Sequence, residues 1–206
     1  CCSLALEKSP WLIEEILNRK HEISAHGVKW ISHAYFSREE EKKIINECYS
    51  SILKLSGRPP LGWHTKSSTS PFTRDLLIEH GGFMYDSNAY NDDIPYVIRQ
   101  NDRKFVIIPY SFDTNDMRFD GNNGFVQGDD FNTYCKESFN QLLSETDDGS
   151  LRMMSIGLHP RIIGRPGRIK GLEDFIKYIK TYENVWIPKR MDIAKYCLER
   201  DSFNFF

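Results

Sequence analysis

Apolar side chains recur at helical spacing in several stretches of this chain. Ser9 and Pro10 supply a cap and a first-turn proline, and the apolar spacing then continues to about residue 20. Ser37 and Glu40 make a capping box at the head of a second helix, which closes at Gly57. Further helices are predicted at about 70–80, 129–143, 168–182 and 192–198.

Short β-rich runs separate these helices. Phe105 to Tyr110 is apolar and rich in β-branched residues, as is typical of a strand buried on both faces in a parallel sheet. Six strands that alternate with about six helices indicate βαβ units. We therefore predict an α/β fold, and the absence of a GxGxxG or phosphate loop favours a barrel. The other predicted strands span 22–25, 61–65, 83–85, 153–158 and 185–188.

The length limits how complete such a barrel can be. A full eight-fold barrel takes about 250 residues, whereas this chain has 206. The alternation also begins near Cys1 with what resembles the end of a strand. We expect a single domain over residues 1–206 that lacks one or two N-terminal barrel units. An opened barrel exposes a sheet edge, which favours a homo-oligomer.

Charge and hydropathy narrow the classes of partner. Lys and Arg number 27 against 29 Asp and Glu, and the net charge of -2 provides no general attraction for nucleic acid or anionic lipid. No apolar run approaches the roughly 18 to 20 residues that a bilayer span requires. We expect a small-molecule substrate and neither nucleic-acid nor membrane partners.

The cysteines point to a reducing compartment. There are 5 of them, an odd number, and none forms a CxxC pair. This pattern disfavours both a disulfide framework and a structural zinc site. We therefore predict reduced thiols in a cytoplasmic protein.

Polar side chains follow the predicted strands at corresponding points. The carboxyl ends of parallel barrel strands converge on one face, and that face carries the active site. Any one of these residues could instead cap a helix or pair inside the protein. Together they predict one cavity, lined by His26, His64, Asp86, Asp113 and His159.

Two long connections, 87–103 and 113–128, also suggest a site, because loops of this length are usually functional or disordered. Both mix aromatic and hydrogen-bonding side chains, which suits a small polar ligand; Asp92, Asp93 and Asn115 belong to this set.

Candidate functional side chains are most concentrated in the stretch from Ser155 to Arg168. His159, Arg161 and Arg165 surround a predicted strand end and the start of a helix, where an anionic or carbonyl oxygen is favoured. A proline-glycine turn with solvated arginines is the other interpretation.

A metal site has no local motif. Four residues after His26 stands Trp30, which cannot ligate, and His33 is offset by seven. We expect no cofactor; the alternative is one divalent metal such as zinc, with ligands from separate strands. Nucleophilic catalysis has no GxSxG elbow and no acylating cysteine to support it.

Five stretches in order resemble the cofactor-independent allantoinases of the polysaccharide deacetylase superfamily, the group with NodB homology that includes carbohydrate esterase family 4. The resemblance is continuous from Pro10 to about Lys195. The stretches are His21 to Gly27 with Trp30, Gly62 to Arg74, Glu79 to Tyr96, Pro109 to Phe119, and Ser155 to Arg168.

This resemblance implies a distorted (β/α)7 barrel that hydrolyses the ring amide of allantoin to give allantoate. It implies that His26 is the histidine of the second deacetylase motif, Arg58 the orienting arginine of the third, and His159 the general acid of the fifth. Trp30 stands where metal-using deacetylases keep a second histidine. The acidic first motif has no counterpart in this chain.

Three functions stay open at this point: an allantoinase-like amidohydrolase, a chitin or peptidoglycan N-deacetylase, and a truncated homologue without catalysis. For the first of these, the expected catalytic residues are His159, His26 and Arg58. The expected substrate-binding residues are Trp30, His64, Asp86, Asp92, Asp93, Asp113, Asn115, Arg161 and Arg165.

Overall fold

The chain forms two compact units in the structure, a computed structural model that describes residues 1–121, 124–146 and 149–200. Unit 1 comprises Cys1–Ala89, Pro95–Ile108 and Pro188–Phe206, and unit 2 comprises Tyr90–Ile94 and Pro109–Ile187. Helices and strands occur together, so the predicted α/β class is confirmed.

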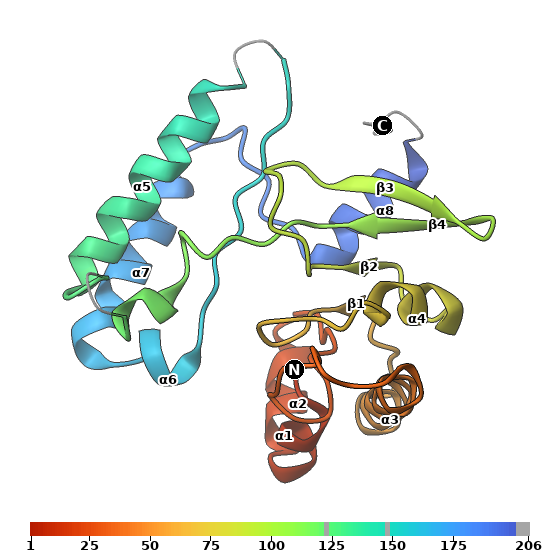
Figure 1. Ribbon diagram of the computed structural model, residues 1–206. Coiled ribbons are helices and arrows are strands. Elements are labelled where there is room, and N and C mark those ends of the chain that lie inside the picture. Colours follow the sequence, from red (N-terminus) through yellow and green to blue (C-terminus); the bar gives the residue numbers. More distant parts are fainter. Residues whose placement is uncertain (122–123, 147–148, 201–206) are drawn as a thin grey trace. The chain divides into compact units, whose positions relative to one another are not determined.

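Unit 1 holds the sheet (Figure 1). Its strands are β1 (Gly62–Trp63), β2 (Tyr85–Asp86), β3 (Tyr96–Gln100) and β4 (Arg103–Ile107), and its helices are α1 (Ser3–Lys8), α2 (Trp11–Asn18), α3 (Arg38–Ser56), α4 (Thr73–His80) and α8 (Arg190–Glu199).

The sheet of unit 1 is mostly parallel. Its strand order is β1-β2-β4-β3, in which β1, β2 and β4 run parallel and β3 pairs antiparallel with β4. Ala25 extends the parallel part through a bridge to Trp63. The core of this unit packs around fully buried side chains such as Ile52, Trp63 and Leu77.

Helix α3 begins and ends where the sequence predicts. The Ser37 side chain accepts from the backbone N–H of Glu40, while the Glu40 carboxylate accepts from the Ser37 N–H at 2.9 Å. Gly57 closes the helix with a φ of 68°, a left-handed conformation that glycine adopts without strain.

Unit 2 is built from helices. They are the 3-10 helix η1 (Asp116–Phe119), α5 (Gly128–Ser144), α6 (Pro160–Ile163) and α7 (Pro166–Ile179). Helices α5 and α7 lie side by side (Figure 1). They approach closely at Gly171, where a Cβ would lie 1.9 Å from the carbonyl oxygen of Gly128. Phe131 and Phe175 lie in the core between them.

One of the two predicted ligand loops ends in a β-hairpin. Residues 87–103 include β3, which pairs with β4 through a two-residue turn at Asn101 and Asp102. Their φ angles of 50° and 59° are those that a tight hairpin turn requires, and Asn and Asp tolerate them. The other loop contains η1, and its residues 122 and 123 lie outside the described part of the chain.

Several predicted strands are shorter than expected. Segment 22–25 contributes one bridge, at Ala25, and segment 153–158 contributes one, between Gly157 and Asn115. Segment 185–188 forms no strand. Helix α2 forms where the first helix is predicted, whereas α1 lies near Cys1, where the end of a strand was expected, and α4 begins at Thr73 rather than Ser70.

The five cysteines are all free thiols, and three of them, Cys48, Cys135 and Cys197, are buried. Within the residues that the structure describes, no helix combines the length and the apolarity needed to cross a bilayer.

Candidate functional site

Two histidines lie at the carboxyl ends of neighbouring parallel strands in unit 1. The N–H of His64 donates to the carbonyl of Ala25 at 3.0 Å, and the N–H of Ser87 donates to the carbonyl of Trp63 at 2.9 Å, so the ladder extends past β1 and β2. His26 follows Ala25 directly. The three residues that leave this edge of the sheet are therefore His26, His64 and Ser87.

The two imidazoles are held by main-chain carbonyls. Nδ1 of His26 donates to the carbonyl oxygen of His64, and Nδ1 of His64 donates to that of Ser87 at 2.7 Å. Their rings stack with centroids 5.2 Å apart and planes 4° from parallel. Because a carbonyl oxygen only accepts, each Nδ1 carries a proton.

His64 is neutral at physiological pH. Burial lowers the pKa of its imidazole to about 4; the hydrogen bond to Ser87 opposes this shift and the positive charge of Arg190 adds to it. Since Nδ1 holds the single proton of the neutral ring, Nε2 is the nitrogen that carries the lone pair.

Helix α8 contributes to the same face of the sheet. Arg190 donates to the Ser87 hydroxyl at 2.7 Å, and the N–H of Met191 donates to Glu22 Oε2 at 2.9 Å. The other oxygen of Glu22 accepts from the Tyr85 hydroxyl at 2.8 Å. Tyr85 lies over Gly62, where a Cβ would come within 1.9 Å of its ring.

Sequence reasoning missed two members of this face. Glu22 alternates with Ser24 and His26 along the predicted strand 22–25, so the two-residue period of a strand could have found it. Arg190 lies 103 residues from Ser87, and its contact with Ser87 depends on where α8 packs. No local signal could have found Arg190.

Asp86 lies on the opposite face of the sheet. In the strand register Asp86 pairs with Trp63, whereas Tyr85 pairs with Gly62, and successive side chains of a strand alternate between faces. Asp86 is completely buried and accepts from Arg74 Nε of α4 at 2.9 Å. We expected Asp86 beside His64; the pleat of the sheet instead directs it toward the helices.

Two other predicted residues of unit 1 lie on loops. Arg58 is exposed and precedes β1, on the amino side of the strand that His64 follows, so the structure does not bring it to the histidines. Trp30 is 39% exposed on the loop after His26, and the Lys66 ammonium lies 5.2 Å from the centroid of its ring.

Unit 2 contains a histidine–carboxylate pair. Nδ1 of His159 donates to Asp116 Oδ1 at 2.6 Å, and the backbone N–H groups of His159 and Ile163 donate to Oδ2 at 2.6 and 3.2 Å. Asp116 is completely buried, whereas the His159 side chain is 18% exposed. The pair fixes the proton of Nδ1, so Nε2 is the atom through which His159 exchanges a proton.

The backbone around this pair is a short parallel bridge. The N–H of Asp116 donates to the carbonyl of Gly157 at 2.9 Å, and the N–H of Gly157 donates to that of Thr114 at 3.1 Å. Asp116 lies within the predicted ligand loop 113–128. Its spacing from His159 is not local, so the sequence alone did not single it out.

The other predicted residues of unit 2 differ in exposure. Asn115 is buried and its amide is used internally: Nδ2 donates to the Tyr110 hydroxyl at 2.9 Å and Oδ1 accepts from the Met117 N–H at 2.8 Å. The remaining members of the set are exposed, namely Asp92, Asp93, Asp113, Arg161 and Arg165. Because His26 and His64 belong to the other unit, the single cavity stays a prediction.

The two stacked histidines do not fit a shared metal ion. A metal bound by two imidazole nitrogens lies close to the plane of each ring, and these planes are stacked and 4° from parallel. Nδ1 of His33, another histidine of this unit, donates to Glu41 Oε1 at 2.8 Å. Among the described residues, no group of three His, Cys, Asp or Glu side chains is arranged to hold an ion.

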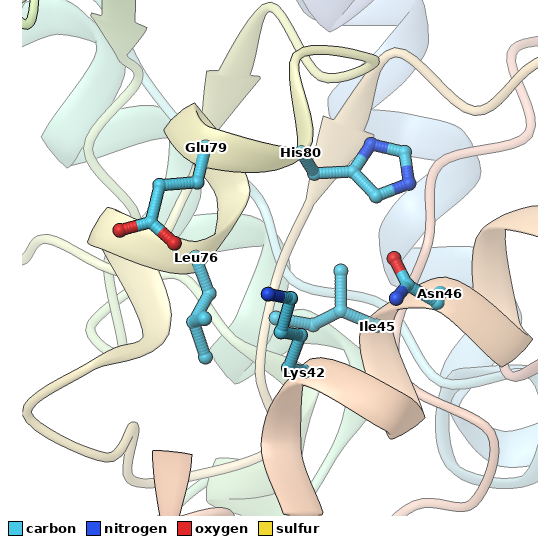
Figure 2. Close-up of a pocket in the computed structure, with 6 residues that line it drawn as sticks. All are labelled: Lys42, Ile45, Asn46, Leu76, Glu79 and His80. Atoms are coloured by element: carbon cyan, nitrogen blue, oxygen red, sulfur yellow. The ribbon is translucent and has the colours of Figure 1, made fainter. Parts of the chain in front are cut away.

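A small cavity of about 90 Å³ opens elsewhere in unit 1, between α3 and α4 (Figure 2). Polar and apolar side chains both line it, and neither His26 nor His64 contributes to it. Its lining consists of Lys42, Ile45, Asn46, Leu76, Glu79 and His80.

Comparison with known proteins identifies the family. No family model matches the chain. A solved structure from Pseudomonas aeruginosa that carries the name polysaccharide deacetylase is 38% identical, with a TM-score of 0.93, and the match covers 98% of this chain and 68% of that one. The chain belongs to the polysaccharide deacetylase family.

Two further relatives differ in the function that their names give. The structure of PuuE allantoinase is 41% identical to this family member, with a TM-score of 0.90, over 95% of this chain and 65% of that one. A Schizosaccharomyces pombe protein that carries the name polysaccharide deacetylase is 33% identical over 93% of this chain. The chain spans 64% of the length of that relative.

Proposed function

We propose that this member of the polysaccharide deacetylase family is an allantoinase-like amidohydrolase that opens the ring amide of allantoin to give allantoate. The observation that carries the proposal is the pairing of His159 with the buried carboxylate of Asp116. The 41% identity to PuuE allantoinase supports the choice of substrate.

His159 has the role of the general acid. The Asp116 carboxylate accepts the hydrogen bond from Nδ1 and fixes the orientation of the ring. Water adds to the amide carbon, a C–O bond forms and the C–N bond breaks. Nε2 of His159 gives its proton to the departing ring nitrogen, which becomes the neutral NH2 of a ureido group in the opened product.

His26 is our candidate for the group that accepts the proton of the attacking water. Its Nδ1 is anchored on the His64 carbonyl, so in the neutral ring Nε2 is the basic nitrogen. Arg161 and Arg165, both exposed near the N-terminus of α7, are our candidates to hold the polar oxygens of the substrate.

Polysaccharide N-deacetylation is the second candidate. The names of the Pseudomonas aeruginosa and Schizosaccharomyces pombe relatives favour it. The same acid would serve it, because an acetamide also requires a proton on its departing nitrogen. The candidates differ in substrate, and a polymer deacetylase often uses an added divalent ion.

The test is a comparison of two assays on the protein expressed from its complete reading frame. Allantoate formation from allantoin is measured beside acetate release from chitin oligosaccharides and peptidoglycan fragments, with and without added zinc. We expect allantoate and no acetate. Acetate release alone would establish the deacetylase instead, and turnover of none of the substrates would favour a homologue without catalysis.

A matched pair of variants ties the activity to the site. His159→Ala should lower turnover about 100- to 10,000-fold, the usual contribution of general acid-base catalysis. His21→Ala replaces an exposed histidine of unit 1 and should leave turnover unchanged. Equal effects of the two substitutions would remove His159 from the mechanism.

A further inference from the structure

One buried carboxylate in unit 1 joins three separate segments of chain. Glu41 of α3 is completely buried. Its Oε1 accepts from His33 Nδ1 at 2.8 Å and from the Thr73 hydroxyl at 2.6 Å, and its Oε2 accepts from the Ser70 hydroxyl. The three donors are themselves 1% to 4% exposed.

These donors satisfy a buried charge. Burial alone would raise the pKa of Glu41, but the hydrogen bonds from His33, Ser70 and Thr73 together lower it below its usual value. Glu41 therefore stays ionised inside the unit. A buried carboxylate of this kind costs free energy unless its donors stay in place, which makes their positions well determined.

The first donor belongs to the loop that leaves His26. Gly27 follows His26 with a φ of 77°, and a Cβ on it would lie 3.3 Å from His33 Nε2, so the backbone next to His26 rests against the His33 ring. A side chain at Gly27 would crowd this contact. His33 in turn is fixed by Glu41.

The second donor, Ser70, belongs to the loop that leaves His64, and the third, Thr73, is the first residue of α4, where that loop ends. Ser70 lies six residues beyond His64. The carbonyl of Ser68 accepts from the His33 N–H at 3.0 Å and from the Ser32 hydroxyl at 3.2 Å. The two loops are thus joined to each other as well as to Glu41.

We propose that Glu41 is a positioning residue: through His33 and Ser70 it fixes the two loops that follow His26 and His64, and so fixes both imidazoles at the candidate site. The effect of Glu41 on catalysis rests on the proposed function. The effect of Glu41 on the positions of the His26 and His64 rings is independent of that function, because it can be measured without substrate.

The experiment follows the ring nitrogens by two-dimensional 1H–15N NMR, with the His26 and His64 signals assigned from His26→Gln and His64→Gln. Glu41→Ala should shift both signals and leave that of exposed His21 in place. Glu41→Gln should restore most of the original positions, because its carboxamide oxygen still accepts and the two hydroxyls can rotate.

Two controls separate positioning from general destabilisation. Glu47→Gln removes an exposed carboxylate from the same helix and should shift neither signal. Ile52→Val trims a completely buried side chain of α3, which lowers stability without touching the carboxylate. The proposal is overturned if Ile52→Val moves the His26 and His64 signals as far as Glu41→Ala does.

Thr73→Val covers the case in which Glu41→Ala does not fold. This substitution keeps the shape of the side chain and removes one of the three donors. We expect smaller shifts of the His26 and His64 signals in the same direction. Unmoved signals in a folded Thr73→Val or Glu41→Ala protein would overturn the proposal, whereas absent allantoin hydrolysis in the native protein would overturn only the proposed function.

Discussion

His64 directly follows β1 and Asp86 is the last residue of the neighbouring parallel strand β2, yet their side chains lie on opposite faces of the sheet. Asp86 pairs in register with Trp63, one residue before His64, so the alternation of the strand separates them. His64 shares its face with His26 and the start of α8, whereas Asp86 is held by α4. The first face therefore holds the two histidines of the candidate site, and the second holds a buried ion pair that stabilises the fold.

The ion pair of Asp86 should therefore contribute to stability. Arg74→Ala removes the guanidinium from a fully buried carboxylate that also accepts from the N–H of Asn88 at 2.9 Å. We expect the free energy of unfolding to fall by about 3 kcal/mol. This is the lower end of the range for breaking a buried ion pair, because the Arg74 side chain is 38% exposed.

Urea unfolding at pH 7 measures this loss, with Arg19→Ala as the matched control. Arg19 pairs with Glu15 on the surface of α2, and loss of such a pair costs about 0.5 kcal/mol or less. Equal losses for the two variants would show that Asp86 tolerates its charge without Arg74.

Protonation of His64 should make the protein less stable in acid. Its pKa is about 4 in the folded state and about 6.5 unfolded, so the unfolded chain binds the extra proton first as the pH falls. Stability should be full above pH 6.5 and decline between pH 6.5 and 4, by on the order of 3 kcal/mol.

The contribution of His64 is obtained by difference. Unfolding free energies of the native protein and of His64→Gln, measured from pH 4 to 8, should converge as the pH falls. His80, whose pKa is also lowered by burial, is present in both proteins and cancels. Parallel curves would contradict the neutral, buried state of His64.

His159 and Asp116 should respond differently to truncation. His159→Ala removes the acid and one hydrogen bond, so turnover falls while stability changes by about 1 kcal/mol. Asp116→Ala also removes the carboxylate that accepts from the N–H of His159, which adds about 1–3 kcal/mol, whereas the N–H of Ile163 keeps the His159 carbonyl as an acceptor at 3.1 Å.

Thermal unfolding and turnover, measured on the same samples, separate the two roles. The melting temperature of Asp116→Ala should lie clearly below that of His159→Ala. If His159→Ala unfolds as easily as Asp116→Ala, then His159 is primarily a structural residue.

Gly62 should not tolerate a side chain. A Cβ at this position would lie 1.9 Å from the Tyr85 ring, which is completely buried and donates to Glu22. Gly62→Ala must displace that ring, and overpacking of this kind costs about 1–3 kcal/mol. Gly167→Ala is the control, because nothing lies within 4 Å of the added carbon; it should be neutral or slightly stabilising. Equal chemical stability of Gly62→Ala and the native protein would contradict the packing described.

Local signals predicted local structure well. The capping box of Ser37 and Glu40, and the glycines Gly57 and Gly81, act within a few residues, and α3 and α4 end where those glycines stand. The sequence does not predict the hairpin of β3 and β4, because its turn, Asn101 and Asp102, lies in the long polar connection 87–103, whose length and polarity are typical of a ligand loop.

Contacts between distant segments explain the rest. The pairing of His26 with His64 could be predicted because both follow parallel strands, but the face of each side chain depends on exact register, which misplaced Asp86. Arg74 and Arg190 reach the sheet from helices, and no sequence spacing encodes where a helix docks. The apolar segment 153–158 lacked ladder partners except at Gly157, so it formed one bridge.

The bond between Glu22 and Met191 spans 169 residues and imposes an order on folding. Synthesis proceeds from the N-terminus, so the strands of unit 1 emerge from the ribosome long before α8 exists. Until then Glu22 lacks the Met191 N–H and Ser87 lacks Arg190. Loop closure over such a separation is entropically costly and slow. Docking of α8 should thus be a late step, and a nascent chain halted before residue 190 should expose this face of the sheet to chaperones.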